Sequence, residues 1–162
     1  MVRVKYRYLL IQIERTPLTN LINFKNPLTL TDVQLKNFIF NTVELNYGDL
    51  GISYLLGSFS VKYLSKETGL AIIRVTRDYY KELATCLTLI NQLDSQPVVI
   101  TILHCSGTII KCQRSAIKHN KELIYSSYKQ LEKMESNDDS IDLNSIENLI
   151  VKERERIEAT EF

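Results

Sequence analysis

The segment GSFSVKYLSKETGLAIIRVT, residues 57–76, decides the fold. Both of its halves are rich in β-branched and aromatic residues, which is typical of strands. Between them, Lys66-Glu67-Thr68-Gly69 supplies a turn with glycine where a positive φ is needed. The segment therefore predicts a β-hairpin. We expect its first strand to begin at Ile52, with a bulge at Gly57, and its second strand to cover Leu70–Thr76.

The residues before the hairpin predict one strand and one helix. The strand covers Val2–Glu14, where β-branched and aromatic residues are again frequent. Thr31 and Gln34 have the spacing of a capping box, which begins a helix, and Gly48 is a good signal for its end.

The residues after the hairpin predict two further helices and one strand. Asp78 is the expected N-cap of a helix that ends at Leu93, and Val98–Cys105 is the next strand. A long last helix is expected over Ile109–Lys133. The order β-α-β-β-α-β with an extra C-terminal helix predicts an α/β protein, more strictly α+β, with a ferredoxin-like antiparallel sheet.

Charge divides the chain into two parts. Residues 1–133 hold 17 Lys or Arg and 10 Asp or Glu, a net charge of +7, whereas residues 134–162 hold 3 and 9, a net charge of −6. A positive body attracts polyanions such as nucleic acid, although charge alone also fits a solvated surface. We therefore expect a ferredoxin-like RNA-binding domain over residues 1–133. We expect residues 134–162 to form an acidic tail, a linker that could end in a short amphipathic helix. Because the tail has few large apolar residues, we expect the domain to fold without it.

Alternation along the strands predicts which side chains share a face of the sheet. The side chains expected against the first two helices include Leu55, Phe59, Val61, Tyr63, Ala71, Ile73 and Val75. The basic side chains expected on the opposite face are Arg3, Lys5, Arg7, Lys62 and Arg74. Leu9, Ile11 and Ile13 would make one end of that face apolar, so we expect another element, such as the last helix, to cover it.

The last helix carries a basic stripe. At 100° per residue, an arc of about 80° holds Lys111, Arg114, Lys118, Lys121, Tyr125 and Lys129. The residues expected to anchor the helix lie beside this arc and are Ile110, Gln113, Ile117, Ile124, Tyr128 and Leu131. Only Glu122 and Glu132 interrupt the stripe, whereas a solvated helix usually alternates its charges. The stripe predicts contact with phosphates, and a solvated face stays the alternative.

The start of the same helix predicts a phosphate-binding site. Gly107 and Thr108 open it, so free backbone N–H groups and the positive end of the helix dipole lie there, one turn from Lys111 and Arg114. The alternative is that Ser106 or Thr108 only caps the helix.

Other kinds of site find little support in the sequence. A zinc site is not expected, because His104 and Cys105 point to opposite faces of a strand, while Cys112 and His119 lie about 10 Å apart along a helix. Walker, dinucleotide and nucleophile-elbow motifs are absent, so we expect no catalytic residues and no cofactor bound by the protein itself. The sequence contains no run of about 18 apolar residues, so it predicts no membrane span. The odd number of cysteines indicates free thiols in a reducing compartment.

Three groups of residues, in order, resemble one known family. They are Arg7-Tyr8-Leu9-Leu10, Ser58–Leu64 with Thr68-Gly69, and Gly107-Thr108-Ile109 with Cys112-Gln113. Together, over residues 1–130, they are similar to the eukaryotic and archaeal small protein subunit of ribonuclease P, the processing-of-precursors subunit five family, which eukaryotes share with RNase MRP.

The resemblance implies a subunit of a ribonucleoprotein endonuclease that removes the 5′ leader of precursor tRNA. Catalysis would belong to the RNA and its Mg²⁺ ions. The partners would be the catalytic RNA and a TIM-barrel-like protein subunit, with precursor tRNA contacted only indirectly. RNase MRP would add ribosomal RNA processing, and the location would be the nucleus and nucleolus.

Two other functions stay open at this point. A stand-alone single-stranded RNA-binding protein, similar to an RNA recognition motif, would need aromatic side chains on an open sheet face. A ferredoxin-like metabolic or regulatory dimer would leave the basic stripe unexplained.

Overall fold

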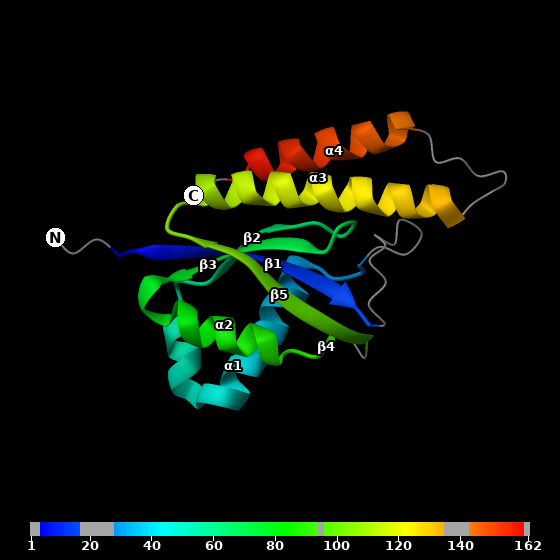
Figure 1. The fold of residues 1–162 in the computed structure, drawn as a ribbon. Coiled ribbons are helices and arrows are strands. Elements are labelled where there is room, and N and C mark those ends of the chain that lie inside the picture. The colour runs from blue at the N-terminus through cyan, green and yellow to red at the C-terminus, as the bar shows by residue number, and fades with distance from the viewer. Residues whose placement is uncertain (1–3, 17–27, 94–95, 135–142, 161–162) are drawn as a thin grey trace.

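The computed structural model describes residues 4–16, 28–93, 96–134 and 143–160 (Figure 1). The elements are β1 Tyr6–Arg15, α1 Asp32–Leu55, β2 Ser60–Leu64, β3 Leu70–Thr76, a 3₁₀ turn Arg77–Tyr79, α2 Tyr80–Leu89, β4 Gln92–Leu93, β5 Gln96–Ser106, α3 Ile109–Met134 and α4 Leu143–Glu158. The strands form an antiparallel sheet in the order β2-β3-β1-β5-β4. The ferredoxin-like prediction is confirmed, with the short β4 added at the outer edge of β5.

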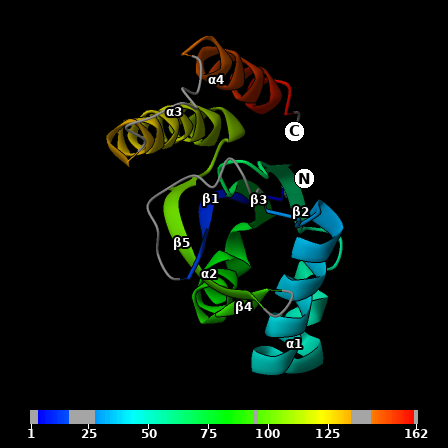
Figure 2. The ribbon, with the colours of Figure 1, turned by 90° about the vertical axis from the view of Figure 1, so that its right-hand side faces the viewer.

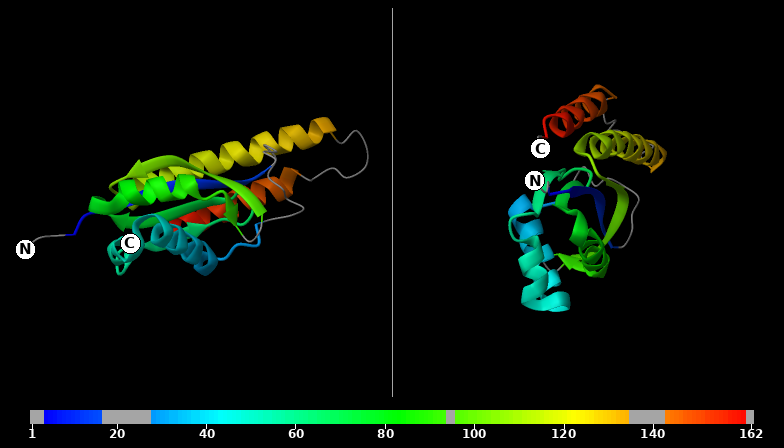
Figure 3. Two further views of the ribbon diagram at one scale, coloured as in Figure 1. Left: turned by 90° about the horizontal axis from the view of Figure 1, so that it is seen from below. Right: turned by 90° about the vertical axis from the view of Figure 1, so that its left-hand side faces the viewer.

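The sheet lies between two layers of helices. Helices α1 and α2 cover one face, and α3 and α4 lie on the other, as the end-on views show (Figures 2 and 3). The larger core fills the α1–α2 side, where Ala71, Ile73 and Val75 of β3 are fully buried as predicted. On the opposite face, Leu70 and Ile72 pack toward α3.

Strand β1 faces the opposite way from the prediction. Leu9, Ile11 and Ile13 belong to the core under α1 and α2, whereas Tyr8 and Leu10 face α3. The alternation rule failed here because β1 is apolar on both faces, so no polar side chain marks the outer one. Since Arg7 alternates with Tyr8, it lies on the α1–α2 side.

Helix α1 begins as expected and ends later than expected. The Thr31–Gln34 capping box is present in both directions. Gly48 interrupts the helix with a φ of +62°, but a second helical stretch follows it to Leu55. The prediction of a strand from Ile52 is therefore wrong, and Gly57, with a φ of +79°, lies before β2.

The irregularity of β2 falls at Lys62 instead of Gly57. The register with β3 shifts between Val61 and Tyr63, so the side-chain alternation reverses there. Phe59 stays in the α1–α2 core, as predicted, while Tyr63 turns to the α3–α4 face. The expectation that both aromatic residues point the same way is wrong.

Helix α2 is shorter than the sequence suggests. Asp78 does not cap it but lies in the 3₁₀ turn, and no side chain caps the helix at Tyr79. Leu93, the expected last residue, belongs to β4. The buried face of α2 carries Leu83 and Leu87.

Helix α3 has the predicted extent but presents a different face to the sheet. Ile109, Cys112 and Ala116 pack on the sheet, and the expected anchor Ile117 packs beside them as predicted. The expected anchor Ile110, by contrast, is 51% exposed. Two other expected anchors contact α4: Ile124 packs on Ile146, and the Gln113 amide donates to the Ile157 carbonyl at 2.8 Å. The side chain of Leu131 lies outside the described residues.

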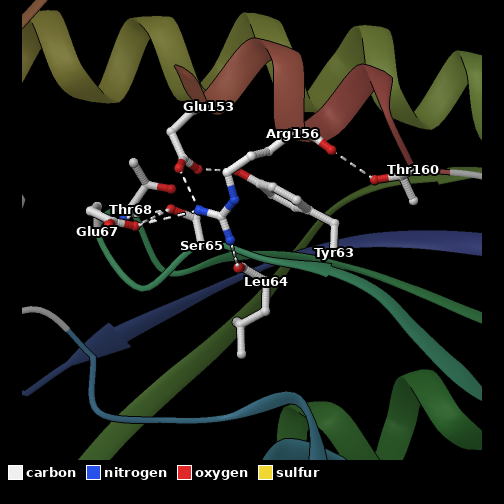
Figure 4. Close-up of polar contacts among 8 residues, drawn as sticks. All are labelled: Tyr63, Leu64, Ser65, Glu67, Thr68, Glu153, Arg156 and Thr160. Atoms are coloured by element: carbon white, nitrogen blue, oxygen red, sulfur yellow. Dashed lines mark hydrogen bonds and ion pairs between the residues drawn. The ribbon is translucent and has the colours of Figure 1, made fainter. Parts of the chain in front are cut away.

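Helix α4 packs against α3 and the β2–β3 hairpin, which contradicts the expectation that the tail has little to bury. Ile146 and Ile157 are 3% and 0% exposed. The fully buried Glu153 accepts a hydrogen bond from the Tyr63 hydroxyl and pairs with Arg156 (Figure 4). Arg156 also donates to the Leu64 carbonyl at 3.1 Å. These contacts join the end of the chain to the hairpin.

Candidate nucleic-acid interface

The basic stripe of α3 is solvent-facing along its length. Its cations Lys111, Arg114, Lys118, Lys121 and Lys129 are all exposed. The residues that pack on the sheet, such as Cys112, lie about half a helical turn away. With a rise of about 1.5 Å per residue, the cations extend over roughly 27 Å, long enough to follow several phosphates of one strand.

Neighbouring side chains neutralise the stripe only weakly. Lys118 lies 3.9 Å from Glu122, with side chains 74% and 58% exposed. An ion pair this exposed contributes little and is easily exchanged for a phosphate. The Lys121 ammonium lies 5.8 Å from the centre of the Tyr125 ring, and Tyr125 is itself 38% exposed. Lys121 and Tyr125 could therefore offer a charge and a ring to the same nucleotide.

The loop that opens α3 brings a further cation to the helix start. A Cβ at Gly107 would come within 2.9 Å of Nη1 of Arg7, so the guanidinium lies against this loop. The Ser106 hydroxyl accepts the Thr108 N–H at 3.2 Å, and both Gly107 and Thr108 are exposed. Ser106 thus satisfies one N–H. The other N–H groups of the first turn lie at the positive end of the helix dipole, where an anion could be accommodated.

Arg74 lies at the same end of the sheet but on the other face. Its strand partner is Tyr8, whereas the partner of Arg7 is Val75, so the two arginines point to opposite sides. The Arg74 guanidinium lies 4.7 Å from the centre of the Tyr6 ring. Its Nε is buried and has no hydrogen-bond partner among the described residues. Arg74 therefore keeps an unused donor beside an aromatic ring.

Arg77 is a cation that the sequence patterns missed. It is exposed, and its backbone N–H donates to the Lys5 carbonyl at 2.8 Å, which places it beside exposed Lys5. The signal available in the sequence was its position directly after β3, because the end of β3 lies opposite the start of β1 in an antiparallel pair.

The other predicted residues lie apart from this group or cannot be placed. Lys62 is on β2, the edge strand, and two strands separate it from β5, a distance of roughly 14 Å. Arg3 lies outside the described residues. The expectation that Arg3, Lys5, Arg7, Lys62 and Arg74 form one surface is therefore not met, because Arg7 and Arg74 face opposite ways.

The cysteines are poor nucleophiles. Burial raises the pKa of the Cys112 thiol to about 12, helped by nearby Cys105, and burial also raises the pKa of Cys86. Burial raises the pKa of Cys105 too, although the Arg7 charge opposes it. In the described ranges, no three His, Cys, Asp or Glu side chains gather closely enough to hold a metal ion. None of the helices described there could cross a membrane.

The sequence comparisons with known proteins agree on one family. A sequence model of the Rpp14/Pop5 family matches residues 7–117. The probable ribonuclease P/MRP protein subunit POP5 of Arabidopsis thaliana is 33% identical over 135 residues, which are 83% of this chain and 89% of that protein. The Schizosaccharomyces pombe ribonuclease P/MRP protein subunit POP5 is 35% identical over 128 residues, 77% of this chain and 92% of that protein. A chain in the cryo-EM structure of yeast ribonuclease MRP superposes with a TM-score of 0.49 and 16% identity, over 67% of this chain and 79% of that chain.

Proposed function

The chain belongs to the Rpp14/Pop5 family, and from this membership we propose that it is a protein subunit of the ribonuclease P and RNase MRP ribonucleoproteins. Support comes from the relatives, which are named as ribonuclease P/MRP subunits and align over most of their length. In this role the chain binds the catalytic RNA and acts in the nucleus, including the nucleolus. A TIM-barrel-like protein subunit is its partner within the particle.

Catalysis in this proposal belongs to the RNA and its Mg²⁺ ions. The particle removes the 5′ leader of precursor tRNA and, as RNase MRP, processes ribosomal RNA. The chain contributes a positively charged surface that braces the catalytic RNA. Its effect on precursor tRNA is indirect, through that RNA. Its high-pKa thiols and scattered carboxylates leave it without an evident acid–base or metal centre in the described ranges.

The basic stripe is the observation that best supports an RNA contact. Its cations are exposed and lie opposite the sheet-packing side of α3. The helix start adds Arg7, Gly107 and Thr108 at one end. An RNA strand that follows the stripe would place one of its phosphates at the start of α3. There, backbone N–H groups and the Arg7 guanidinium would both donate hydrogen bonds to that phosphate.

The two alternative functions are less well supported because the face they need is covered. A base-stacking sheet or a sheet-mediated dimer requires open strands, but α3 and α4 lie over that face (Figure 2). Phe59 lies in the opposite core, and Tyr63 bonds to Glu153 under α4.

The proposal predicts that the stripe controls RNA affinity. Changing Lys111, Arg114, Lys118 and Lys121 to Gln should leave the fold intact, because Gln keeps side-chain length and helix propensity. Binding to the catalytic RNA should weaken by at least about tenfold. The slope of log affinity against log salt should become shallower by roughly 3, because four phosphate contacts are lost. A filter-binding or fluorescence titration at several salt concentrations measures both values.

A matched control separates the stripe from net charge. Lys36, Lys66, Lys81 and Lys152 are also exposed and lie outside the stripe. Changing these four to Gln removes the same charge and should have a much smaller effect. Equal losses in both variants would reduce the effect to net charge, and full affinity in the stripe variant would assign the RNA contact elsewhere.

A further inference from the structure

One long strand of the sheet has an unpaired edge. Strand β5 pairs with β1 along one side, whereas on its other side the two-residue strand β4 pairs only with Gln96 and Pro97 (Figure 2). From Val99 onward, none of the described strands lies beside β5 on this outer side. We call residues 99–105 of β5 the open edge.

Neighbouring hydrogen bonds show which backbone groups point outward from the open edge. The Val98 N–H donates to the Asn91 carbonyl at 2.9 Å, on the β4 side. Backbone groups of successive residues in a strand point to alternate sides, so those of Ile100 and Ile102 also point outward. The β1 partner of Ile100 agrees with this assignment, because the N–H of that partner, Ile13, donates on the β3 side.

The outward groups of the open edge have no strand to bind within the described part of the chain. Neither Ile100 nor Ile102 makes a backbone hydrogen bond on that side to a described residue. Unpaired N–H and C=O groups in a row are a template for another strand.

The other edge of the sheet, by contrast, is protected in the ways that free edges usually are. Strand β2 has only five residues, carries Lys62 and is irregular there. The Arg156 guanidinium also donates to the Leu64 carbonyl. Strand β5 has eleven residues and no Lys, Arg, Asp or Glu. Its irregularity with β1 falls at Leu103, beyond the regular stretch that ends at Ile102.

The side chains beside the open edge are uncharged. Val98 and Ile100 lie in the core under α1 and α2. Val99, which is 41% exposed, and exposed Thr101 alternate with them and lie on the face toward α3. A strand added here would cover Val99 and gain β-branched neighbours. A phosphate would find no cation within β5, so the open edge suits protein better than RNA.

We propose that the open edge receives an extended, uncharged segment of a partner protein, which adds a strand to the sheet beside β5. Main-chain hydrogen bonds of Ile100 and Ile102 supply affinity, and Val99 and Thr101 select apolar or β-branched side chains in the added strand. The open edge rests on its own geometry and would stand if the RNA proposal failed.

A second copy of the chain fits the open edge less well. Antiparallel pairing of two β5 strands would form one continuous sheet related by a two-fold axis perpendicular to it. Both α3 helices, each with its basic stripe, would then lie on the same face of that sheet. Repulsion between the two stripes opposes this arrangement, whereas a partner segment without charge avoids it.

Amide hydrogen exchange tests the open edge residue by residue. In the isolated full chain, the outward amides of Ile100 and Ile102 should exchange at least about tenfold faster than those of Val99 and Thr101, which face β1. In the affinity-purified particle, the outward amides should slow by at least about tenfold. Slow exchange already in the isolated chain would show that the chain covers its own edge, and slowing that depends on chain concentration would assign the edge to a second copy. Either result overturns the proposal.

A pair of matched variants tests the class of partner. Val99→Lys with Thr101→Lys places two charges at the open edge without altering the core. Thr85→Lys with Val151→Lys adds the same charge at exposed positions of α2 and α4. The edge variant should lower the recovery of one protein component of the particle severalfold while the RNA is retained, and the helix variant should lower neither. If the edge variant fails to fold, exchange in the unaltered chain still decides.

Four outcomes of these experiments can be told apart. Slow outward amides in a particle built on the edge variant, with full protein recovery, would overturn the open edge as a docking site. Slowing by the catalytic RNA alone, or loss of RNA from the edge variant, would assign the edge to nucleic acid and also overturn it. Absence of the catalytic RNA from the complex of the unaltered chain would count against the proposed function, while exchange at Ile100 and Ile102 would still test the open edge.

Discussion

At the scale of single residues, the small size of Gly107 lets the Arg7 guanidinium lie against the loop before α3. A Cβ at Gly107 would meet the Arg7 guanidinium at 2.9 Å, but the flexible tip of Arg7 can move away. Because the φ of Gly107 is not in the positive region, Gly107→Ala should change the free energy of unfolding by less than about 0.5 kcal/mol. RNA affinity should fall severalfold, since the guanidinium is displaced from the loop. Thermal unfolding and an RNA titration test both statements.

A double-mutant cycle distinguishes this pairing from a local backbone effect. Arg7→Gln should weaken RNA binding about as much as Gly107→Ala, and the double variant no further than either. Additive losses would mean that Gly107 contributes to RNA binding independently of Arg7.

Tyr63 joins β2 to α4 through a buried hydrogen bond. Tyr63→Phe removes the hydroxyl that donates to buried Glu153, so a carboxylate oxygen loses its partner. We expect a loss of about 1–3 kcal/mol in the free energy of unfolding. Exposed Tyr125 supplies the control, because Tyr125→Phe should leave the unfolding midpoint almost unchanged. A similar small effect in both variants would contradict the inferred contact.

The same contact predicts how stability depends on pH. Burial and the hydrogen bond to Glu153 raise the pKa of Tyr63 far above its usual value of 10. The folded chain therefore keeps this phenol protonated while the unfolded chain ionises it, so the stabilisation is complete below pH 10 and is lost as pH rises above it. The loss between pH 10 and 11 should be smaller in Tyr63→Phe than in the original chain.

At the scale of elements, α4 is a packed part of the fold. Ile157 is fully buried between α4 and the sheet, whereas Val151 on the same helix is 53% exposed. Ile157→Ala should therefore cost about 2–5 kcal/mol, up to the full free energy of α4 docking, and Val151→Ala well under 1 kcal/mol. Thermal unfolding compares the two. Equal midpoints would restore the expectation that the tail is dispensable.

Local signals predicted the elements that they control directly. The capping box at Thr31 and the turn at Gly69 are set by neighbouring residues, and both are present as expected. The faces of β1 and β2 depend on partners distant in sequence, and a bulge at Lys62 reverses the alternation without any glycine to announce it.

In the candidate interface, too, local features could be predicted from the sequence and long-range contacts could not. Helical spacing predicted the exposure of Lys111 and Arg114, although it assigned Ile110, which is exposed, to the buried side of the same helix. The approach of Arg7 to Gly107 depends on β1 pairing beside β5, and the burial of Glu153 depends on α4 crossing the hairpin. No pattern in a single sequence encodes those long-range contacts.

At the scale of the whole molecule, we expect catalysis to belong to the RNA and structural support to belong to this protein chain. The purified chain, free of RNA, should not cleave precursor tRNA with Mg²⁺ present. EDTA should abolish the activity of the assembled particle but leave the unfolding midpoint of the isolated chain unchanged, because the metal ions belong to the RNA. Leader removal by rigorously RNA-free chain would contradict the proposed division.

The docking of α4 also bears on the order of folding. The hydrogen bond between Tyr63 and Glu153 joins residues 90 positions apart, so it forms only after a long loop has closed. The sheet and the first three helices precede α4 in the chain and become available first during synthesis. Native contacts of α4 should therefore be absent from the folding transition state, and a substitution such as Ile157→Ala should accelerate unfolding with little effect on the folding rate. The chain then has a nearly complete sheet whose α3–α4 face stays partly uncovered until its last helix arrives.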